Sequence, residues 1–245
     1  MIEAAETMSA QARVSVSVGI VLFNNAHDEV LRCLASLQRQ ASDAICEVLI
    51  LDQGTGHPLL PAYRFPVRVS RGPNLGFGAA HNILFSSSQG DTYLCLNPDA
   101  VLHPKCLAYM LAVLDASQGR ALVEALHEPI PHPKIYDPVT GETPWCSGAC
   151  LLIPREIYSS LKGFDEDFFL YCEDVDFSWR ARAAGFACQL APSAKVFHFA
   201  DDRENRRAAM LRSAETLWRK WKNHPSRSIV DPDFSHGAIY ATPLW

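Results

Sequence analysis

The first half of the chain alternates apolar segments with segments of helical periodicity, and this alternation restricts the fold more than any other feature. Val14–Phe23 begins with valines alternating with serines and ends in an apolar run, as a strand entering a buried sheet does. From about His27 to Gln40 apolar residues recur at helical spacing. Further strands are predicted at 48–51, 67–69 and 93–96, and further helices from the 72–78 turn to 85 and from 104 to about 114. This order predicts an α/β fold, a mostly parallel sheet covered by helices, with ligands at the carboxyl ends of its strands.

The second half has a different pattern but is not separated from the first by a flexible linker. A proline-rich segment lies at 129–144, an apolar stretch at 150–153 and an acidic-aromatic segment at 163–177. A helix is predicted to follow to 185, then two short strands at 187–190 and 195–199, and a long helix at about 203–223. We therefore expect one continuous domain at 14–200, with a donor half at about 14–115 and an acceptor half at about 116–200. An N-terminal extension (1–13) precedes it, and a C-terminal helix and tail (201–245) follow.

Composition excludes several classes of protein. The 22 basic and 27 acidic residues give a net charge of −5, unlike a nucleic-acid-binding polycation, and 48% apolar residues suit a buried core. The most apolar stretch, Val14–Phe23, is much shorter than the ~20 residues of a membrane-spanning helix. Residues 1–13 lack the apolar region of a secretory signal, so a cytoplasmic location is expected.

The eight cysteines contain no CxxC pair, and most of them lie in apolar runs, as reduced core thiols do. The nearest pairs of zinc-binding residue types are Cys146/Cys150 and His127/His132, and they do not predict metal-cysteine chemistry.

Acidic residues stand where a ligand of such a sheet is expected. Asp52 ends the second predicted strand, Asp99 follows the fourth, and Glu173-Asp174-x-Asp176 opens a later helix. Carboxylates supply oxygen ligands for a cation that holds a diphosphate, although helix capping explains the same acids without a ligand. The turn from Gly72 to Asn82 lacks the third glycine of a dinucleotide fingerprint and a Walker lysine. Its glycines are explained by either phosphate binding or a tight turn.

The order of the motifs along the chain is more specific than any one of them. Phe23-Asn24 and Asp52 are followed by Asn74-x-Gly76-Phe77-Gly78-x-Ala80-x-Asn82, Asn97-Pro98-Asp99-Ala100, Trp145-Cys146-Ser147-Gly148-Ala149 and Gly163-Phe164-Asp165-Glu166-x-Phe168-Phe169-x-Tyr171-x-Glu173-Asp174-x-Asp176. Over residues 14–200 this set resembles the family 2 glycosyltransferases of GT-A fold, particularly the bacterial rhamnosyltransferase-like branch.

The resemblance implies a donor side for a nucleotide-diphosphate sugar. Asp52 looks like the aspartate that contacts the base or ribose, with Phe23 and Asn24 near the same pocket. The other donor-side positions that it implies are Asn74, Gly76, Asn82, Asn97 and Asp99. Asn97-Pro98-Asp99 matches an Asp-x-Asp motif in which asparagine replaces the first aspartate, so Asp99 would bind the Mn²⁺ or Mg²⁺ that bridges the diphosphate.

Further positions are implied for the metal, the base and the acceptor side. His198 resembles a histidine that completes the metal site in some members, or is an ordinary residue at a strand end. Asp174 resembles the catalytic base. Glu173, Trp145 and Gly148 fall on the acceptor side, where Trp145 either stacks on a sugar or packs in the core.

The expected activity is inverting transfer of a sugar, from dTDP-rhamnose first and a UDP-hexose second, to a glycan or polyprenyl-linked acceptor. A sugar-phosphate nucleotidyltransferase is one alternative, but it would carry a basic glycine-rich loop where this chain has Asn24-Asn25-Ala26-His27. A non-catalytic module that binds nucleotide sugars is another.

The C-terminal helix is strongly basic. Residues 203–227 carry eight basic and two acidic residues, a net charge of +6, which leaves −11 for the rest of the chain. The helix has apolar residues on one face: Met210, Leu211, Ala214, Leu217, Trp218 and Trp221. This face either docks on the catalytic domain or holds the enzyme peripherally against anionic lipid at the inner face of the cytoplasmic membrane.

Overall fold

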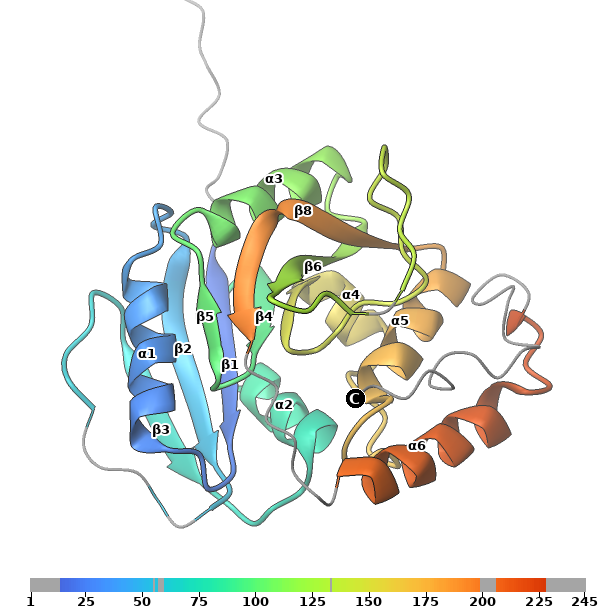
Figure 1. The fold of residues 1–245 in the computed structure, drawn as a ribbon, viewed down its shortest axis with the longest axis horizontal. Helices are drawn as coiled ribbons and strands as arrows, with labels where there is room; N and C mark the ends of the chain where they lie inside the picture. Colours follow the sequence, from blue (N-terminus) through green and yellow to red (C-terminus); the bar gives the residue numbers. More distant parts are fainter. Residues whose placement is uncertain (1–13, 55, 57–59, 133, 199–205, 228–245) are drawn as a thin grey trace, which may run out of the picture.

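A computed structural model describes residues 14–54, 56, 60–132, 134–198 and 206–227. Within them, eight strands form one sheet in the order β3-β2-β1-β4-β7-β6-β8-β5, with helices on both faces (Figure 1). The predicted extension at 1–13, the end of the chain after 227 and the segment 199–205 lie outside the described residues.

The first half folds as the sequence predicts. The elements are β1 (Val16–Leu22), α1 (His27–Gln38), β2 (Ile45–Asp52), β3 (Val67–Arg71), α2 (Phe77–Ser86) and β4 (Thr92–Leu96). The four strands pair in parallel, and Leu22 on β1 lies opposite Asp52 on β2. The carboxyl ends of β1 and β2 therefore meet at one edge of the sheet.

The second half departs from a simple parallel arrangement. Its elements are β5 (Ala100–Leu102), α3 (Cys106–Ala116), β6 (Ala121–Glu128), β7 (Cys150–Pro154), α4 (Arg155–Ser160), α5 (Glu173–Ala183), β8 (Ala187–His198) and α6 (Arg206–Trp221). β7 pairs antiparallel with β4 and β6, β5 pairs antiparallel with β8, and β6 pairs parallel with β8. Parallel pairings thus form the larger share of a mixed sheet.

The structure contains three elements that the sequence did not predict, and it joins two predicted strands into one. β5, β6 and α4 have no counterpart in the prediction. The two short strands expected at 187–190 and 195–199 form the single strand β8, whose described part ends at His198. Its register against β6 shifts between Ala191 and Lys195, and this irregularity accommodates Pro192, which has no N–H to give to the sheet.

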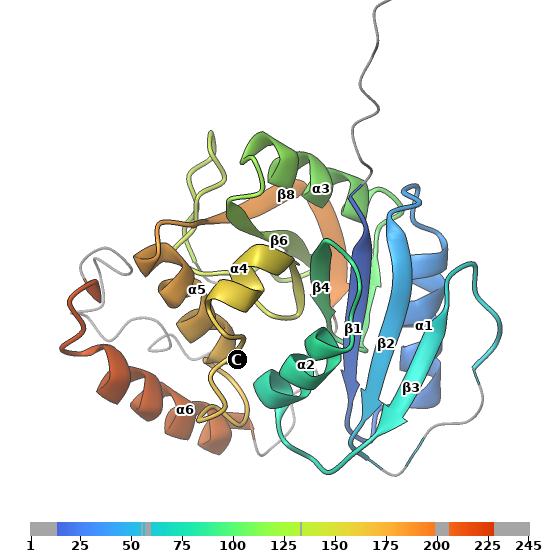
Figure 2. The same ribbon diagram turned by 180° about the vertical axis from the view of Figure 1, so that it is seen from behind.

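Two apolar clusters cover the two faces of the sheet. One joins Val16, Val18 and Ile20 of β1 to α1 and α3, and the other joins Tyr93 and Cys95 of β4 to α2, α4 and α5. These two groups of helices lie on opposite faces of the sheet (Figures 1 and 2). All eight cysteines are free thiols, and only Cys46 of them is exposed. The seven buried cysteines act as packing residues, as their apolar surroundings in the sequence indicate.

Helix α6 lies along α5 and packs against it (Figure 1). Leu217 and Trp221 are buried in a third cluster with Val175 and Trp179 of α5. The Trp221 Nε1–H donates to Asp176 Oδ1 at 2.8 Å. The apolar face predicted from the sequence is divided, because Leu211 and Trp218 remain 63% and 45% exposed. Docking on the catalytic domain therefore accounts for part of that face. No helix in the described residues is long and apolar enough to cross a bilayer.

We expect Trp221→Ala to lower the free energy of unfolding by about 3–5 kcal/mol, because it removes a fully buried ring. Chemical denaturation followed by circular dichroism measures the change. Trp218→Ala on the same helix is the matched control, expected within about 0.5 kcal/mol of wild type. Equal losses in the two variants would contradict the docking of α6 through Trp221.

Candidate active site

A cavity of about 610 Å³ opens at the carboxyl ends of the first three strands of the sheet. Asp52 and Arg71 line it among mostly apolar side chains. Asp52 is buried, and its Oδ1 accepts a hydrogen bond from the Gly54 N–H at 2.9 Å. Its Oδ2 is also buried but has no hydrogen-bond partner among the described residues. A buried carboxylate oxygen seldom lacks a partner, so this atom suits an N–H or O–H of a ligand in the cavity.

Phe23 and Asn24 follow β1 at the same edge of the sheet. Phe23 is exposed, and Asn24 has a left-handed backbone with φ of 55°. A Cβ added to Gly54 would collide with Asn24, so the glycine lets the chains after β1 and β2 approach closely. Asn24 therefore lies against the segment that follows Asp52, and Phe23 precedes it in the chain.

The turn before α2 is held by Gln53, a residue that the sequence analysis did not single out. Gln53 Oε1 accepts from the Leu75 N–H at 2.6 Å, and its Nε2 donates to the Gly76 carbonyl at 3.3 Å. Gly76 has φ of 86°, and a Cβ there would overlap the Phe169 carbonyl oxygen. Asn74 caps the turn, its Oδ1 accepting from the Gly76 N–H at 3.2 Å. Close contact with the segment around Phe169 is sufficient to explain this glycine without a bound phosphate.

The side-chain amide of Asn82 is fully engaged within the protein. Its Nδ2 donates to the Phe164 carbonyl and to Glu166, each at 3.0 Å. Its Oδ1 accepts from the Phe164 N–H and the Tyr158 hydroxyl, each at 2.9 Å. An asparagine amide makes about four such bonds, so the geometry makes Asn82 a support for the 163–166 segment and leaves nothing for the expected donor contact.

Asn97, Asp99 and His198 lie together, although the histidine is about a hundred residues further along the chain. The pairing of β5 with β8 places Ala100 opposite His198. His198 Nε2 lies 3.3 Å from Asp99 Oδ1 and 3.1 Å from Asn97 Nδ2. A carboxylate oxygen and an imidazole nitrogen at this separation fit a divalent cation of the Mn²⁺ type.

Asp174 lies in the first turn of α5, where two backbone amides hold its carboxylate. Its Oδ2 accepts from the Gly148 N–H at 2.9 Å, and its Oδ1 accepts from the Val175 N–H at 2.8 Å. Burial raises the pKa of Asp174, while these two hydrogen bonds act in the opposite direction. The preceding residues Tyr171 and Cys172 have φ of 70° and 65°, a strained approach of the kind that clusters at functional sites.

Glu173 is buried beside Asp174, and its Oε2 has no hydrogen-bond partner in the described part of the chain. Burial and the adjacent Asp174 carboxylate raise the pKa of Glu173 well above its usual value. The two neighbouring carboxyl groups therefore differ, since two backbone amides favour the ionised form of Asp174 and only its own backbone amide does so for Glu173.

Gly148 and Trp145 have different roles in the structure. A Cβ on Gly148 would lie 2.9 Å from the Phe77 ring and 3.6 Å from the Asp174 Cβ, so the glycine permits the close approach to the acid. Trp145 is only 9% exposed, belongs to the cluster between α5 and α6, and has the Lys134 ammonium 4.1 Å from its ring centre. Of the two alternatives for Trp145, this geometry favours core packing over stacking on a sugar.

A buried polar cluster next to these residues was missed by the sequence analysis. Glu124 on β6 accepts at Oε2 from the Ser147 N–H at 2.8 Å and forms an ion pair with Lys134. Burial alone would raise the pKa of Glu124, but the charges of Lys134 and the hydrogen bond from His132 hold it at about 2. The amides of Ser147 and Gly148 thus bind Glu124 and Asp174 in succession. The sequence does contain a signal for this cluster, because Glu124 is the one acid inside the apolar run 121–126. A carboxylate buried in such a run needs a charged or hydrogen-bonding partner.

Residues 17–171 match the Glycosyl transferase family 2 model. The chain belongs to this family. This family membership favours glycosyl transfer over the alternative activity of a sugar-phosphate nucleotidyltransferase.

Two curated relatives are rhamnosyltransferases. The chain is 29% identical over 220 residues to the N-acetylglucosaminyl-diphospho-decaprenol L-rhamnosyltransferase of Mycobacterium tuberculosis (strain ATCC 25618 / H37Rv), covering 68% of this chain and 70% of the relative. It is 25% identical over 163 residues to the rhamnosyltransferase WbbL of Escherichia coli (strain K12), covering 51% of this chain and 61% of the relative. The family 2 enzyme is thus rhamnosyltransferase-like.

Solved structures support the GT-A fold. GalNAc-T7, solved with UDP, GalNAc and Mn²⁺, superposes with a TM-score of 0.74 at 16% identity, covering 87% of this chain and 49% of its own length. The mannosyltransferase PcManGT from Pyrobaculum calidifontis, solved with GDP-Man and Mn²⁺, gives 0.70 at 18% identity, covering 94% and 70%. At these identities the likeness concerns the fold.

Proposed function

We propose that the protein transfers a sugar from a nucleoside diphosphate to an acceptor hydroxyl with inversion, and that Asp174 is the general base. The observation that carries this proposal is the setting of Asp174. Two amides fix its carboxylate at the start of α5, and burial keeps its pKa above that of an exposed aspartate. A hydroxyl is a poor nucleophile at neutral pH, so a positioned carboxylate must accept its proton as it attacks.

The donor is proposed to extend from the cavity at Asp52 toward Asp99. β2 and β4 flank β1, so they lie about 10 Å apart across the sheet, which is the scale of a nucleoside and its phosphates. Asp52 Oδ2 is available for the nucleoside. Asp99 and His198 would hold Mn²⁺ or Mg²⁺, and the Asn97 side chain would lie next to these two ligands. When bound, the cation stabilises negative charge on the departing diphosphate.

One displacement is sufficient for the reaction. The acceptor hydroxyl attacks the anomeric carbon, its proton passes to Asp174, and the bond from that carbon to the diphosphate oxygen breaks. The products are the glycoside and the nucleoside diphosphate. Cys146 and Cys150 are buried thiols with raised pKa values, Cys146 chiefly through burial and Cys150 through a hydrogen bond with Cys106 and then burial. Neither therefore suits a nucleophile that would form a covalent intermediate.

We propose dTDP-rhamnose as the first candidate donor and a UDP-hexose as the second, with a glycan or a polyprenyl-linked sugar as acceptor. The names of the two relatives support rhamnose, and that of the mycobacterial relative supports a lipid-linked acceptor.

Thermal shift with a panel of nucleotide sugars, with and without Mn²⁺, tests donor binding, because a ligand bound to the folded state raises Tm. We expect the largest shift with dTDP-rhamnose and Mn²⁺, followed by turnover with a polyprenyl-linked acceptor. Binding without transfer to any acceptor or water would instead support the non-catalytic module.

A lipid-linked acceptor makes peripheral membrane contact through α6 a further proposal. The exposed Leu211 and Trp218 lie on one flank of the helix, two turns apart, among the basic residues Arg207, Arg212, Arg219 and Lys222. Such a flank suits an anionic lipid surface, where each basic residue contributes about 1 kcal/mol.

We expect the protein to sediment with anionic vesicles at low salt, and less at high salt or with neutral vesicles. The double variant Leu211→Ser/Trp218→Ser should lower this binding without changing stability, because both side chains are exposed. Ile83→Ser, an exposed apolar residue on α2, is the matched control. If wild type stays in the supernatant with anionic vesicles at low salt, α6 does not bind membranes.

A further inference from the structure

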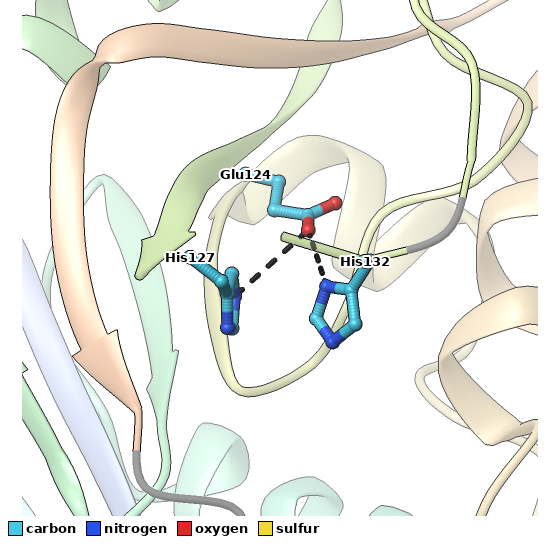
Figure 3. Close-up of side chains that lie close together, drawn as sticks. All are labelled: Glu124, His127 and His132. Atoms are coloured by element: carbon cyan, nitrogen blue, oxygen red, sulfur yellow. Dashed lines mark hydrogen bonds and ion pairs between the residues drawn. The ribbon is translucent and has the colours of Figure 1, made fainter. Parts of the chain in front are cut away.

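Beside the proposed catalytic residues, three potential metal ligands converge on one point. Glu124 and His127 come from β6, and His132 comes from the segment that follows it. Figure 3 shows the carboxylate of Glu124 directed between the two imidazole rings. One ligand atom from each residue lies within 4.8 Å of the others. Glu124 Oε1 is 3.1 Å from His132 Nδ1 and 3.9 Å from His127 Nε2.

His127 provides a second, independent observation. It is buried, yet neither of its ring nitrogens has a hydrogen-bond partner among the described residues. A buried imidazole that satisfies neither nitrogen is costly unless something else engages it. A metal ion bound at Nε2 would engage that atom.

The separations suit a small transition-metal ion. Zinc with bonds of about 2.0–2.1 Å places its ligand atoms about 3.3–3.4 Å apart in a tetrahedron, and the two observed distances bracket this value. Lys134 and the Ser147 N–H engage the other oxygen of Glu124, which directs Oε1 toward the histidines. The nearby ammonium charge also makes the site weaker than one with an unpaired carboxylate.

We propose that Glu124, His127 and His132 bind a divalent transition-metal ion, Zn²⁺ in preference, at a site separate from Asp99. Two imidazoles and one carboxylate form a set that zinc binds with a fourth position left to water. His132 is 24% exposed and gives the ion access from solvent. The ion would fasten the segment after β6 to the sheet. It would lie near the Asp99 site, since the His127 and His198 rings are 5.3 Å apart. The proposal does not depend on the transferase activity.

The test uses the 245-residue chain with two background substitutions. Asp99→Ala removes the expected cation ligand, and Cys46→Ser removes the exposed thiol. Isothermal titration with Zn²⁺ and metal analysis after dialysis give the affinity and stoichiometry. Co²⁺ as a second probe reports coordination through its visible absorption. We expect one equivalent of zinc and a higher Tm when zinc is bound.

Individual ligands are then replaced in that background. His132→Gln and His127→Gln should each weaken zinc binding by about 100-fold or more. His103→Gln, an exposed histidine before α3, is the control and should leave the affinity unchanged. His132 is partly exposed, so its variant keeps the test valid if His127→Gln fails to fold. Absence of zinc binding in the background protein, or equal losses in the His132 and His103 variants, would overturn the proposal. Donor binding to the wild type reports separately on the proposed transferase.

Discussion

Replacing Asp174 with asparagine is expected to lower the rate of sugar transfer by about 10²–10⁴-fold while donor affinity stays nearly unchanged. Asparagine keeps the size of the side chain and an oxygen that can accept one of the two amide hydrogen bonds at 2.8–2.9 Å. It cannot accept the proton of the acceptor hydroxyl. Initial rates of transfer and calorimetric donor binding measure the two effects, and near-normal turnover would remove Asp174 from the role of base.

Glu173→Gln is the matched control, because Glu173 is the adjacent buried carboxyl group. We expect a much smaller effect on turnover than in Asp174→Asn. The reverse order, with Glu173→Gln inactive and Asp174→Asn active, would make Glu173 the base.

The pH dependence gives an independent check on the base. Asp174 accepts a proton only when ionised, so the transfer rate should fall as pH falls through its pKa. Because burial raises that pKa, the fall should begin at a higher pH than for an exposed aspartate. This acidic limb should be absent from the residual activity of Asp174→Asn, and its persistence there would assign it to another group.

Much of the donor half could be predicted because local pattern and sheet geometry agree there. The strands of β1, β2 and β4 are apolar runs ended by polar residues, and parallel strands bring those ends to one edge. Asp52 and Asp99 were found by this rule. The proximity of His198 to Asp99 followed only from the resemblance, since it depends on the antiparallel pairing of β5 with β8.

The rest depends on contacts that no local pattern records. From the sequence alone, Trp145 fits a sugar-binding surface as well as a core position. The structure distinguishes the two, because Leu217 and Trp221 of α6 belong to the same buried cluster as Trp145. His127 and His132 have a spacing that zinc sites use, but the sequence does not show which carboxylate they face, and they meet Glu124 because the chain turns back after β6. The acid of the cluster lies in β6, a strand that was not predicted. The apolar face of α6 divides because the catalytic domain covers Ser213, Leu217 and Trp221, while Leu211 and Trp218 stay exposed.

Replacing Asp99 with alanine is expected to weaken donor binding in Mn²⁺ by about 100-fold or more, and to abolish the response of donor affinity to added Mn²⁺. The variant removes the one carboxylate at the proposed cation site, since Asn97 has no charge to replace it. Loss of a direct ligand should cost at least as much as the 10–100-fold typical of residues that only support ligands. Donor titrations with Mn²⁺ and with chelator measure both effects.

The opposite substitution sharpens this prediction. Asn97→Asp adds a carboxylate next to His198 Nε2, which lies 3.1 Å from the Asn97 amide nitrogen. We expect it to lower the Mn²⁺ concentration needed for donor binding, because a second charged oxygen strengthens a hard-cation site. The wild type could instead bind the donor equally well in chelator and in Mn²⁺, while Asn97→Asp binds it more tightly in Mn²⁺. That result would mean that the wild-type enzyme has lost its cation because asparagine replaces aspartate at position 97. In that case His198 would lose its role as a ligand, and stabilisation of the departing diphosphate would have to come from the side chains and amides of the protein alone.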